Sequence, residues 1–358
     1  MRAVVFYDIG DVRYEENWPE PSPGPGEVKI ATSWCGICGT DMEDYERGAV
    51  IPIDAPHPLS GQQAPIVIGH EFSGRVAELG EGVVGLEVGQ RVAVECIRSC
   101  MTCYWCQRGE YSVCTSMVSI GQQEDGGCAE YFTAPAENVV PLPEQLGEDI
   151  AAMAEPLAVM VRAVRRGRVM VGDVVTIVGA GAIGLCGIGV ARASGASRVI
   201  AVAHGGRRAE AAASVGATVV LDSREEGWRD TYLDLTNGLG SDVVIDAGGN
   251  PAAVHLAVEL TKRQGRCVLN SVIDDDVPIP GLDVMLGEKE IVGSVGHRTE
   301  QEFKWALQLL ADGRVNVEPI ITDRIPLEDA VEEGFKRLRR DRDHIKILVT
   351  PRRDLLKE

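Results

Sequence analysis

The sequence predicts an α/β protein in which a doubly wound parallel sheet is joined to a mostly β part. From about residue 151 onward, strand-like runs alternate with helical patterns, which is typical of a parallel sheet covered by helices. Before that point, short β-type runs are separated by turns rich in glycine and proline, which favours a compact, mostly antiparallel unit. The 358 residues are enough for two parts that each have a core.

Three runs in the first part have the composition of strands: residues 27–36, 73–83 and 90–96. Turn sequences such as PSPGPGE and LGEGV lie between them. The segment 46–65 has several prolines and little periodicity, so we expect a long surface loop there.

The second part begins with apolar residues at helical spacing in DIAAMAEPLAVMVRAVRRG. A strand, a glycine turn, a helix and a second strand are expected next, in DVVTIVGAGAIGLCGIGVARASGASRVIAVA. Further strands are predicted at 217–222, 241–249 and 265–272. After about residue 300 come two helical patterns, QEFKWALQLLADG and LEDAVEEGFKRLRR, and the strand-like run HIKILVTP.

The charge and the cysteine content limit the class of protein. A formal net charge of -19 opposes binding to nucleic acid or to an anionic membrane. The N-terminus has no signal-type apolar segment and no apolar run is long enough to span a bilayer, so we expect a cytoplasmic protein. Thiols stay reduced there, and the 10 cysteines are then better explained as metal ligands or packed side chains than as disulfides.

The turn after the strand VVTIV has the pattern G-x-G-x-x-G, formed by Gly179, Gly181 and Gly184. Because it follows a strand and opens a helix, it has the context of a dinucleotide-binding turn. Gly179 allows the tight turn, Gly181 lets the backbone approach a pyrophosphate, and Gly184 allows helix and strand to pack closely. Ala182 and Ile183 add free N–H groups at the helix N-terminus. The alternative is a turn that needs glycines only for its geometry.

The end of the next strand predicts which nicotinamide cofactor binds. NAD-preferring proteins have an acid there, about 20 residues after the glycine turn, to hold the ribose 2′-OH. Here the strand ends at Ala203 and His204, and Arg207 and Arg208 follow. An arginine can pair with a 2′-phosphate, and basic residues at a helix start favour an anionic partner. We predict that NADP(H) is preferred over NAD(H), although both arginines have an alternative role as solvated residues.

Two groups of residues have the chemistry of zinc ligands. The segments CGICGTD, GHEFSG and MAEP supply Cys38, His70, Glu71 and Glu155, and a catalytic zinc uses three such N, S or O ligands and one open position. Spacing alone does not pair residues this far apart. The second group comprises Cys100, Cys103, Cys106 and Cys114, whose short spacing suits one tetrahedral ion. An iron–sulfur cluster also uses four thiolates, so it remains an alternative to zinc at this group.

These motifs, GICGTD, GHEFSG, the cysteine cluster, AEP and GAGAIG, together resemble the zinc-dependent medium-chain alcohol/polyol dehydrogenase family over essentially the whole chain. The run HPLSGQQAPIVIGHEFSG is most similar to the branch of 2,3-butanediol and sorbitol dehydrogenases. The resemblance implies a GroES-like catalytic domain at 1–155 and 300–358, with a structural zinc lobe at 96–114, and a Rossmann domain at 156–299. By analogy, we expect a homodimer or homotetramer.

The resemblance also assigns roles at the catalytic zinc. Cys38, His70 and Glu155 match the protein ligands, and Glu71 matches a neighbouring carboxylate that approaches or binds the metal as the site rearranges. Asp41 matches a residue that orients a metal-bound group. The four clustered cysteines match the ligands of a second, structural zinc.

The implied reaction is hydride transfer between a nicotinamide cofactor and a secondary alcohol, vicinal diol or polyol, or the matching ketone. Thr40 matches the hydroxyl that relays the alcohol proton. Family members often have histidine two residues after the aspartate, whereas this sequence has Glu43, which is a poor base at neutral pH. Two alternatives stay open here: a zinc-free quinone or enoyl reductase of the same fold, and a nucleotide-binding protein without enzymatic activity.

Overall fold

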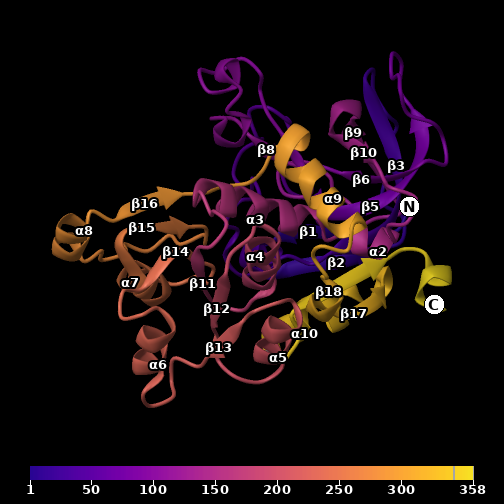
Figure 1. The fold of residues 1–358 in the computed structure, drawn as a ribbon. Coiled ribbons are helices and arrows are strands. Elements are labelled where there is room, and N and C mark those ends of the chain that lie inside the picture. The colour runs from indigo at the N-terminus through magenta and orange to yellow at the C-terminus, as the bar shows by residue number, and fades with distance from the viewer. Residues whose placement is uncertain (342, 358) are drawn as a thin grey trace. The chain divides into compact units, whose positions relative to one another are not determined.

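The computed structural model describes residues 1–341 and 343–357, which fold as two compact units (Figure 1). Unit 1 comprises Met1–Glu155, His297–Ala311 and the described residues from Ile321 onward, and unit 2 comprises Pro156–Gly296 and Asp312–Ile320. The sequence analysis assigned all residues from 300 onward to the first part, and that assignment fails for Asp312–Ile320.

The reason is local packing in unit 2. Gly189 leaves room for Val315, because a Cβ on Gly189 would lie 2.7 Å from Val315 Cγ1. Arg314 also donates from Nη2 to the carbonyl of Ala193 at 2.6 Å. Conversely, His297 and the two residues after it belong to unit 1, although the predicted Rossmann domain extended to residue 299.

Unit 1 is built on a seven-stranded sheet with the order β10-β6-β5-β3-β18-β17, in which β9 also pairs with β3. All pairs are antiparallel except β17 with β18. The strands are β3 (Glu27–Gly36), β5 (Glu71–Leu79), β6 (Arg91–Val94), β9 (Tyr131–Pro135), β10 (Val139–Pro141), β17 (Ile321–Pro326) and β18 (Lys346–Thr350). The C-terminal strand therefore lies beside β3, with Leu348 opposite Gly36.

Two smaller sheets and several short helices complete unit 1. The sheets have the orders β2-β1-β4 and β7-β8, formed by β1 (Ala3–Asp8), β2 (Asp11–Glu15), β4 (Ile66–Val67), β7 (Ile97–Arg98) and β8 (Val118–Ser119). The α-helices are α1 (Gly39–Arg47), α2 (Glu148–Ala151), α9 (Lys304–Ala311) and α10 (Lys336–Arg340). The predicted loop 46–65 has no strand or helix after α1 ends. Among the described residues, no helix combines the length and apolar character that crossing a bilayer needs.

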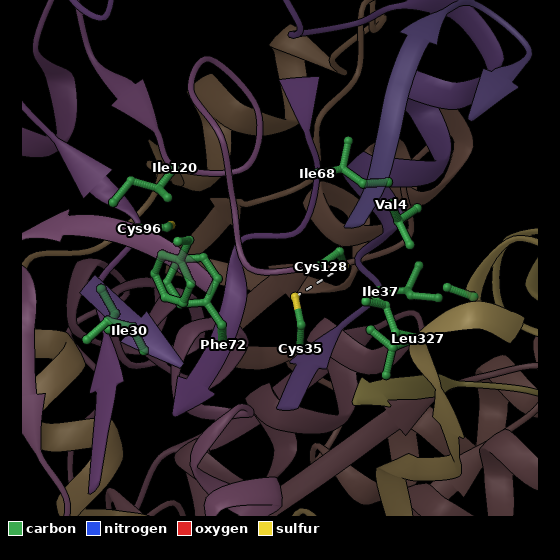
Figure 2. Packing of buried hydrophobic residues seen from close by; sticks show 14 of the residues in the cluster. Val4, Ile30, Cys35, Ile37, Ile68, Phe72, Cys96, Ile120, Cys128 and Leu327 are labelled. Carbon is green, nitrogen blue, oxygen red and sulfur yellow. Dashed lines mark hydrogen bonds between the residues drawn. The ribbon is translucent and has the colours of Figure 1, made fainter. Parts of the chain in front are cut away.

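The core of unit 1 combines side chains of the large sheet, such as Ile30 of β3 and Phe72 of β5, with residues from outside that sheet, such as Val4 (Figure 2). The rings of Phe72 and Phe132 pack with their centroids 4.3 Å apart. Cys35 and Cys128 are buried in this core with their Sγ atoms 3.4 Å apart (Figure 2). Cys35 is thus a packed thiol.

Unit 2 is a parallel sheet with the strand order β13-β12-β11-β14-β15-β16. Numbered within the unit this is 3-2-1-4-5-6, the order of a dinucleotide-binding doubly wound sheet. The strands are β11 (Val174–Val178), β12 (Arg198–Val202), β13 (Val219–Leu221), β14 (Ser241–Asp246), β15 (Thr261–Leu269) and β16 (Glu290–Gly293). The α-helices are α3 (Ala154–Arg166), which begins in unit 1, α4 (Ala182–Ala193), α5 (Arg207–Ser214), α6 (Trp228–Leu235), α7 (Pro251–Leu260) and α8 (Gly281–Gly287). The predicted fold class is confirmed.

Candidate functional site

Cys38, His70 and Glu71 converge in unit 1 because of the pairing of β3 with β5. Gly36, at the end of β3, lies opposite Glu71, at the start of β5. Cys38 lies two residues after the end of β3 and is the N-cap residue of α1. One ligand atom from each of the three side chains lies within 4.8 Å of the others. We call these three residues the metal-ligand group.

Asp41, in the first turn of α1, holds two members of this group. Its Oδ2 accepts a hydrogen bond from the backbone N–H of Cys38 at 2.8 Å. Its Oδ1 lies 3.1 Å from His70 Nδ1. The carboxylate therefore orients the imidazole so that Nε2 remains for a metal, and Thr40 Oγ1 lies 3.3 Å from that nitrogen.

Lys346 is a buried partner of this group that the sequence analysis missed. Its Nζ lies 2.6 Å from both carboxylate oxygens of Glu71 and donates to the carbonyl of Ile37 at 2.9 Å. The pairing of β18 beside β3 brings this lysine to the group. The available signal was a single lysine in the otherwise apolar run HIKILVTP.

Glu155 takes a different position from the one expected of a third ligand. It lies outside the metal-ligand group, at the start of α3, and its Oε1 is 2.8 Å from His297 Nε2. It is nevertheless close enough to act electrostatically on the group. Burial raises the pKa of Glu71, Lys346 opposes this rise, and the charge of Glu155 adds to it.

The chemistry of the metal-ligand group fits a divalent zinc ion. A thiol, an imidazole and a carboxylate are the donor types that zinc takes in proteins. The surroundings of His70 also favour positive charge: burial lowers the pKa of His70, yet Asp41 and Cys38 raise it well above its ordinary value. Cys38, His70 and Glu71, with Glu155 nearby, would therefore hold a catalytic zinc.

Cys100, Cys103, Cys106 and Cys114 form a second group, again with ligand atoms within 4.8 Å of one another. The Sγ–Sγ distances are 4.0 Å for Cys100–Cys106, 3.5 Å for Cys103–Cys106 and 4.0 Å for Cys103–Cys114. A tetrahedron with Zn–S bonds of about 2.3 Å has its sulfur atoms roughly 3.8 Å apart. The cysteines are free thiols, and their spacing fits one ion better than a cluster of several iron atoms.

The glycine turn of unit 2 has the geometry that its sequence predicted. Gly179 has a φ of +102°, and a Cβ there would lie 2.5 Å from the carbonyl oxygen of Ala247. A Cβ on Gly184 would lie 1.9 Å from the carbonyl oxygen of Gly179, so the helix approaches the turn closely. Gly181 caps α4 and has open space where its Cβ would be. Ala182 and Ile183 begin this helix, which suits a phosphate at its N-terminus.

The end of β12 lies beside charged residues of the next strand. Ala203 is buried, and His204 and Arg207 are exposed. Asp222, which follows β13, accepts a hydrogen bond from the backbone N–H of Gly205 at 3.1 Å and pairs with Arg224. Arg207 and Arg208 begin α5, and the first turn of this helix also contains Glu210. The sequence analysis did not include Asp222 or Arg224.

Comparison with known proteins agrees with this architecture. Residues 24–144 match the alcohol dehydrogenase GroES-like domain, and residues 182–312 match the zinc-binding dehydrogenase family. The (R,R)-butanediol dehydrogenase of Bacillus subtilis strain 168 is 35% identical over 353 residues, which are 98% of this chain and 100% of that protein. The L-threonine 3-dehydrogenase of Pyrococcus horikoshii is 36% identical over 320 residues, 89% of this chain and 90% of the relative.

Solved structures of dehydrogenases are also similar to this chain over nearly its whole length. The crystal structure of 2R,3R-butanediol dehydrogenase from Bacillus subtilis matches with a TM-score of 0.91 at 35% identity, over 98% of this chain and 99% of that chain. A zinc-binding dehydrogenase of Sinorhizobium meliloti 1021 bound to NADP gives 0.89 at 29% identity, with the same coverage. An alcohol dehydrogenase from E. coli CFT073, complexed with NADH, gives 0.87 at 28% identity, again with that coverage.

Replacing one clustered cysteine tests the second metal group. Cys103→Ser is expected to lower the zinc content from two ions per chain toward one, because a tetrahedral site loses a ligand. The melting temperature should fall by about 5 °C or more, since a bound structural metal contributes directly to folding. Metal analysis and thermal unfolding measure both effects.

Cys267→Ala, a buried thiol in unit 2 far along the chain from either group, serves as the control and should keep the wild-type zinc content. A wild-type protein with a single zinc and four freely titratable thiols at 100–114 would contradict the assignment.

Proposed function

The chain belongs to the zinc-dependent medium-chain alcohol/polyol dehydrogenase family, and we propose that it interconverts a secondary alcohol, vicinal diol or polyol with the matching ketone. The observation that supports this most is the convergence of Cys38, His70 and Glu71. A zinc-free reductase of the same fold does not need these metal ligands, and a protein that only binds a nucleotide does not need them either. The relatives are named after 2,3-butanediol and L-threonine, and both compounds carry a secondary hydroxyl group.

The bound zinc would supply a Lewis acid for the substrate oxygen, and the nicotinamide cofactor would exchange the hydride. The residues of this chain hold and orient the metal ligands. Asp41 fixes Cys38 and His70, and Lys346 fixes Glu71 through both carboxylate oxygens. Because these partners are buried, the ligands are held in place before substrate arrives.

We assign the movement of the alcohol proton to Thr40. Its hydroxyl lies 3.3 Å from His70 Nε2, at the edge of the metal-ligand group, and its side chain is only partly buried. A hydroxyl accepts one proton while it donates another, so Thr40 can take the proton from the alcohol oxygen and pass it toward solvent.

For the cofactor, we propose that NADP(H) binds better than NAD(H). The loop after β12 has no carboxylate of its own, and Arg207, Arg208 and Arg224 lie around it. Asp222 is the nearest acid that a 2′-phosphate would meet, and its charge is already paired with Arg224. Arginine suits a phosphate because its planar group forms two parallel hydrogen bonds.

We also propose that two or four copies of the chain associate. Unit 2 exposes large apolar side chains on α8, and β16 is the edge strand of its sheet. Leu282, Met285 and Leu286 are 68%, 63% and 58% exposed. An unpaired strand edge beside apolar side chains favours association with another copy.

Turnover of a vicinal diol tests the function and the cofactor together. With 2,3-butanediol, kcat/KM for NADP⁺ is expected to exceed that for NAD⁺ by at least about tenfold, the effect of one lost charge-assisted contact of roughly 1.4 kcal/mol or more. In Arg207→Ala/Arg208→Ala, the ratio should fall while kcat/KM for NAD⁺ stays the same.

Removal of the metal with a chelator should stop this turnover, and added Zn²⁺ should restore it. If kcat/KM of the wild-type protein for NAD⁺ equals or exceeds that for NADP⁺, the cofactor proposal is wrong and the proposed reaction is unaffected. Brisk turnover without any bound metal would remove the proposed function.

The proton relay predicts a loss of kcat in Thr40→Ala of about 10²-fold, as for other positioned proton-transfer groups. Thr40→Ser keeps the hydroxyl and should retain most of the activity. Steady-state kinetics with an unchanged zinc content measures the effect, and a Thr40→Ala variant as fast as the wild type would refute the relay.

Association through α8 predicts that Leu286→Asp gives a smaller species than the wild type in analytical ultracentrifugation. A buried charge at an apolar interface has no partner, so the assembly should weaken. Val84→Asp, at a side chain of unit 1 that is 87% exposed, is the control. The proposal fails if the wild type sediments as a monomer or if Leu286→Asp leaves the assembly intact.

A further inference from the structure

A buried histidine of unit 1, His297, lies between two carboxylates and makes no hydrogen bond to Cys38 or His70. Its Nδ1 is 2.7 Å from Glu95 Oε2, and its Nε2 is 2.8 Å from Glu155 Oε1. The histidine is 1% exposed, Glu95 is 1% exposed and Glu155 is 8% exposed. The metal-ligand group does not include any of these three residues.

We propose that His297 is a positioning residue that holds the carboxylate of Glu155 toward the catalytic metal, with Glu95 as the anchor of the histidine. This inference rests on the proposed function, in which Glu155 acts at the metal. Both hydrogen-bond acceptors are carboxylate oxygens, so both ring nitrogens must donate. The ring then bridges the two carboxylates in one fixed orientation.

Glu95 is itself immobilised, which makes it a suitable anchor. It follows β6, and its Oε1 accepts a hydrogen bond from the backbone N–H of Ile97 at 3.0 Å. Its backbone N–H donates to the carbonyl of Asn138 at 2.9 Å, and its carbonyl accepts from Asn138 Nδ2 at 2.8 Å. These three hydrogen bonds therefore fix Glu95, and Glu95 fixes the imidazole.

Neighbouring side chains further restrict the movement of the His297 ring and of the Glu155 carboxylate that it bridges to Glu95. The ring of Phe303 packs beside that of His297 with centroids 6.0 Å apart. The thiol of Cys96 points at Glu155 Oε1 from 3.9 Å. Oε1 of Glu155 is thus engaged from two sides. Within residues 1–341 and 343–357, no group donates a hydrogen bond to Oε2, which leaves that oxygen for the metal or its bound groups.

Glu95, Cys96 and His297 have the composition of a third metal site, because their ligand atoms also lie within 4.8 Å of one another. The hydrogen bonds favour the bridge instead. Each ring nitrogen has its carboxylate, and each oxygen of Glu95 has its donor, so the arrangement is complete without an ion. The zinc content of the wild-type protein decides between the two readings.

A double-mutant cycle with Glu155 tests the bridge. His297→Phe removes both donors, and we expect kcat to fall roughly 10- to 100-fold, the usual effect of losing a residue that orients a metal ligand. Release of one zinc per chain to a chromogenic chelator should become faster, while the KM for the nicotinamide cofactor stays unchanged. In a Glu155→Gln background, His297→Phe should have no further effect on either quantity, because its only route of action is gone.

Two further variants separate positioning from general destabilisation. His344→Phe is a matched control, since His344 is also buried in unit 1 and lies between Asp323 and Asp341, at 3.1 and 3.4 Å. It should lower stability without changing zinc release. His297→Gln keeps one N–H that can reach Glu155 and should recover part of kcat, and it also replaces His297→Phe if that variant does not fold.

Each other outcome counts against the inference. If Glu155→Gln slows the enzyme and His297→Phe and His297→Gln do not, the positioning role is wrong and the proposed function stands. Equal losses from His297→Phe with and without Glu155 would show an independent role and overturn it. A Glu155→Gln variant like the wild type would remove the proposed role of Glu155 itself. Three zinc ions per wild-type chain, with two in His297→Phe, would make the cluster a metal site.

Discussion

The balance of buried charge in unit 1 is the constraint on which the site depends. The carboxyl groups of Asp41, Glu71, Glu95 and Glu155 are all almost removed from solvent. Buried basic side chains lie beside them: Lys346 beside Glu71, His297 beside Glu95 and Glu155, and His70 beside Asp41. An uncompensated buried charge costs several kcal/mol, so carboxylates and a nearby thiol at this density require further positive charge. A divalent ion at Cys38, His70 and Glu71 supplies it, and the same ion is what the chemistry of an alcohol dehydrogenase needs.

The seven-stranded sheet is what makes this concentration of charge possible. Its central strand β3 pairs with β5 on one side and with β18 on the other, and so it brings together Glu71 and Lys346, which are 275 residues apart. Glu95 comes from the end of the neighbouring strand β6. Paired strands therefore hold Glu71 and Lys346, and rigid elements hold a catalytic site more firmly than loops do. The function thus depends on strand register, because a slip of one residue would turn these side chains to the opposite face.

Local patterns predicted most of the fold and part of the site. The glycine turn was predictable because the close approaches at Gly179 and Gly184 arise within a short segment. The cysteine group was predictable because one loop contains all four cysteines. Cys38 and His70 were assigned by family resemblance, since nothing in their spacing joins them. Lys346, Glu95 and His297 were missed because their partners lie far away along the chain, and their only sequence signal was a polar residue beside an apolar run. Residues 312–320 were assigned to the wrong unit for a similar reason: Val315 packs against Gly189, a contact that only the folded chain reveals.

The most direct test of the account is the location of the metal itself, by anomalous diffraction at the zinc edge from crystals of the purified protein. The account predicts one peak within bonding distance of Cys38 Sγ and His70 Nε2, beside the carboxylates of Glu71 and Glu155, and a second at the centre of the four cysteine sulfurs. A zinc-replete protein with no peak between Cys38 and His70, or with these side chains pointing apart, would contradict it.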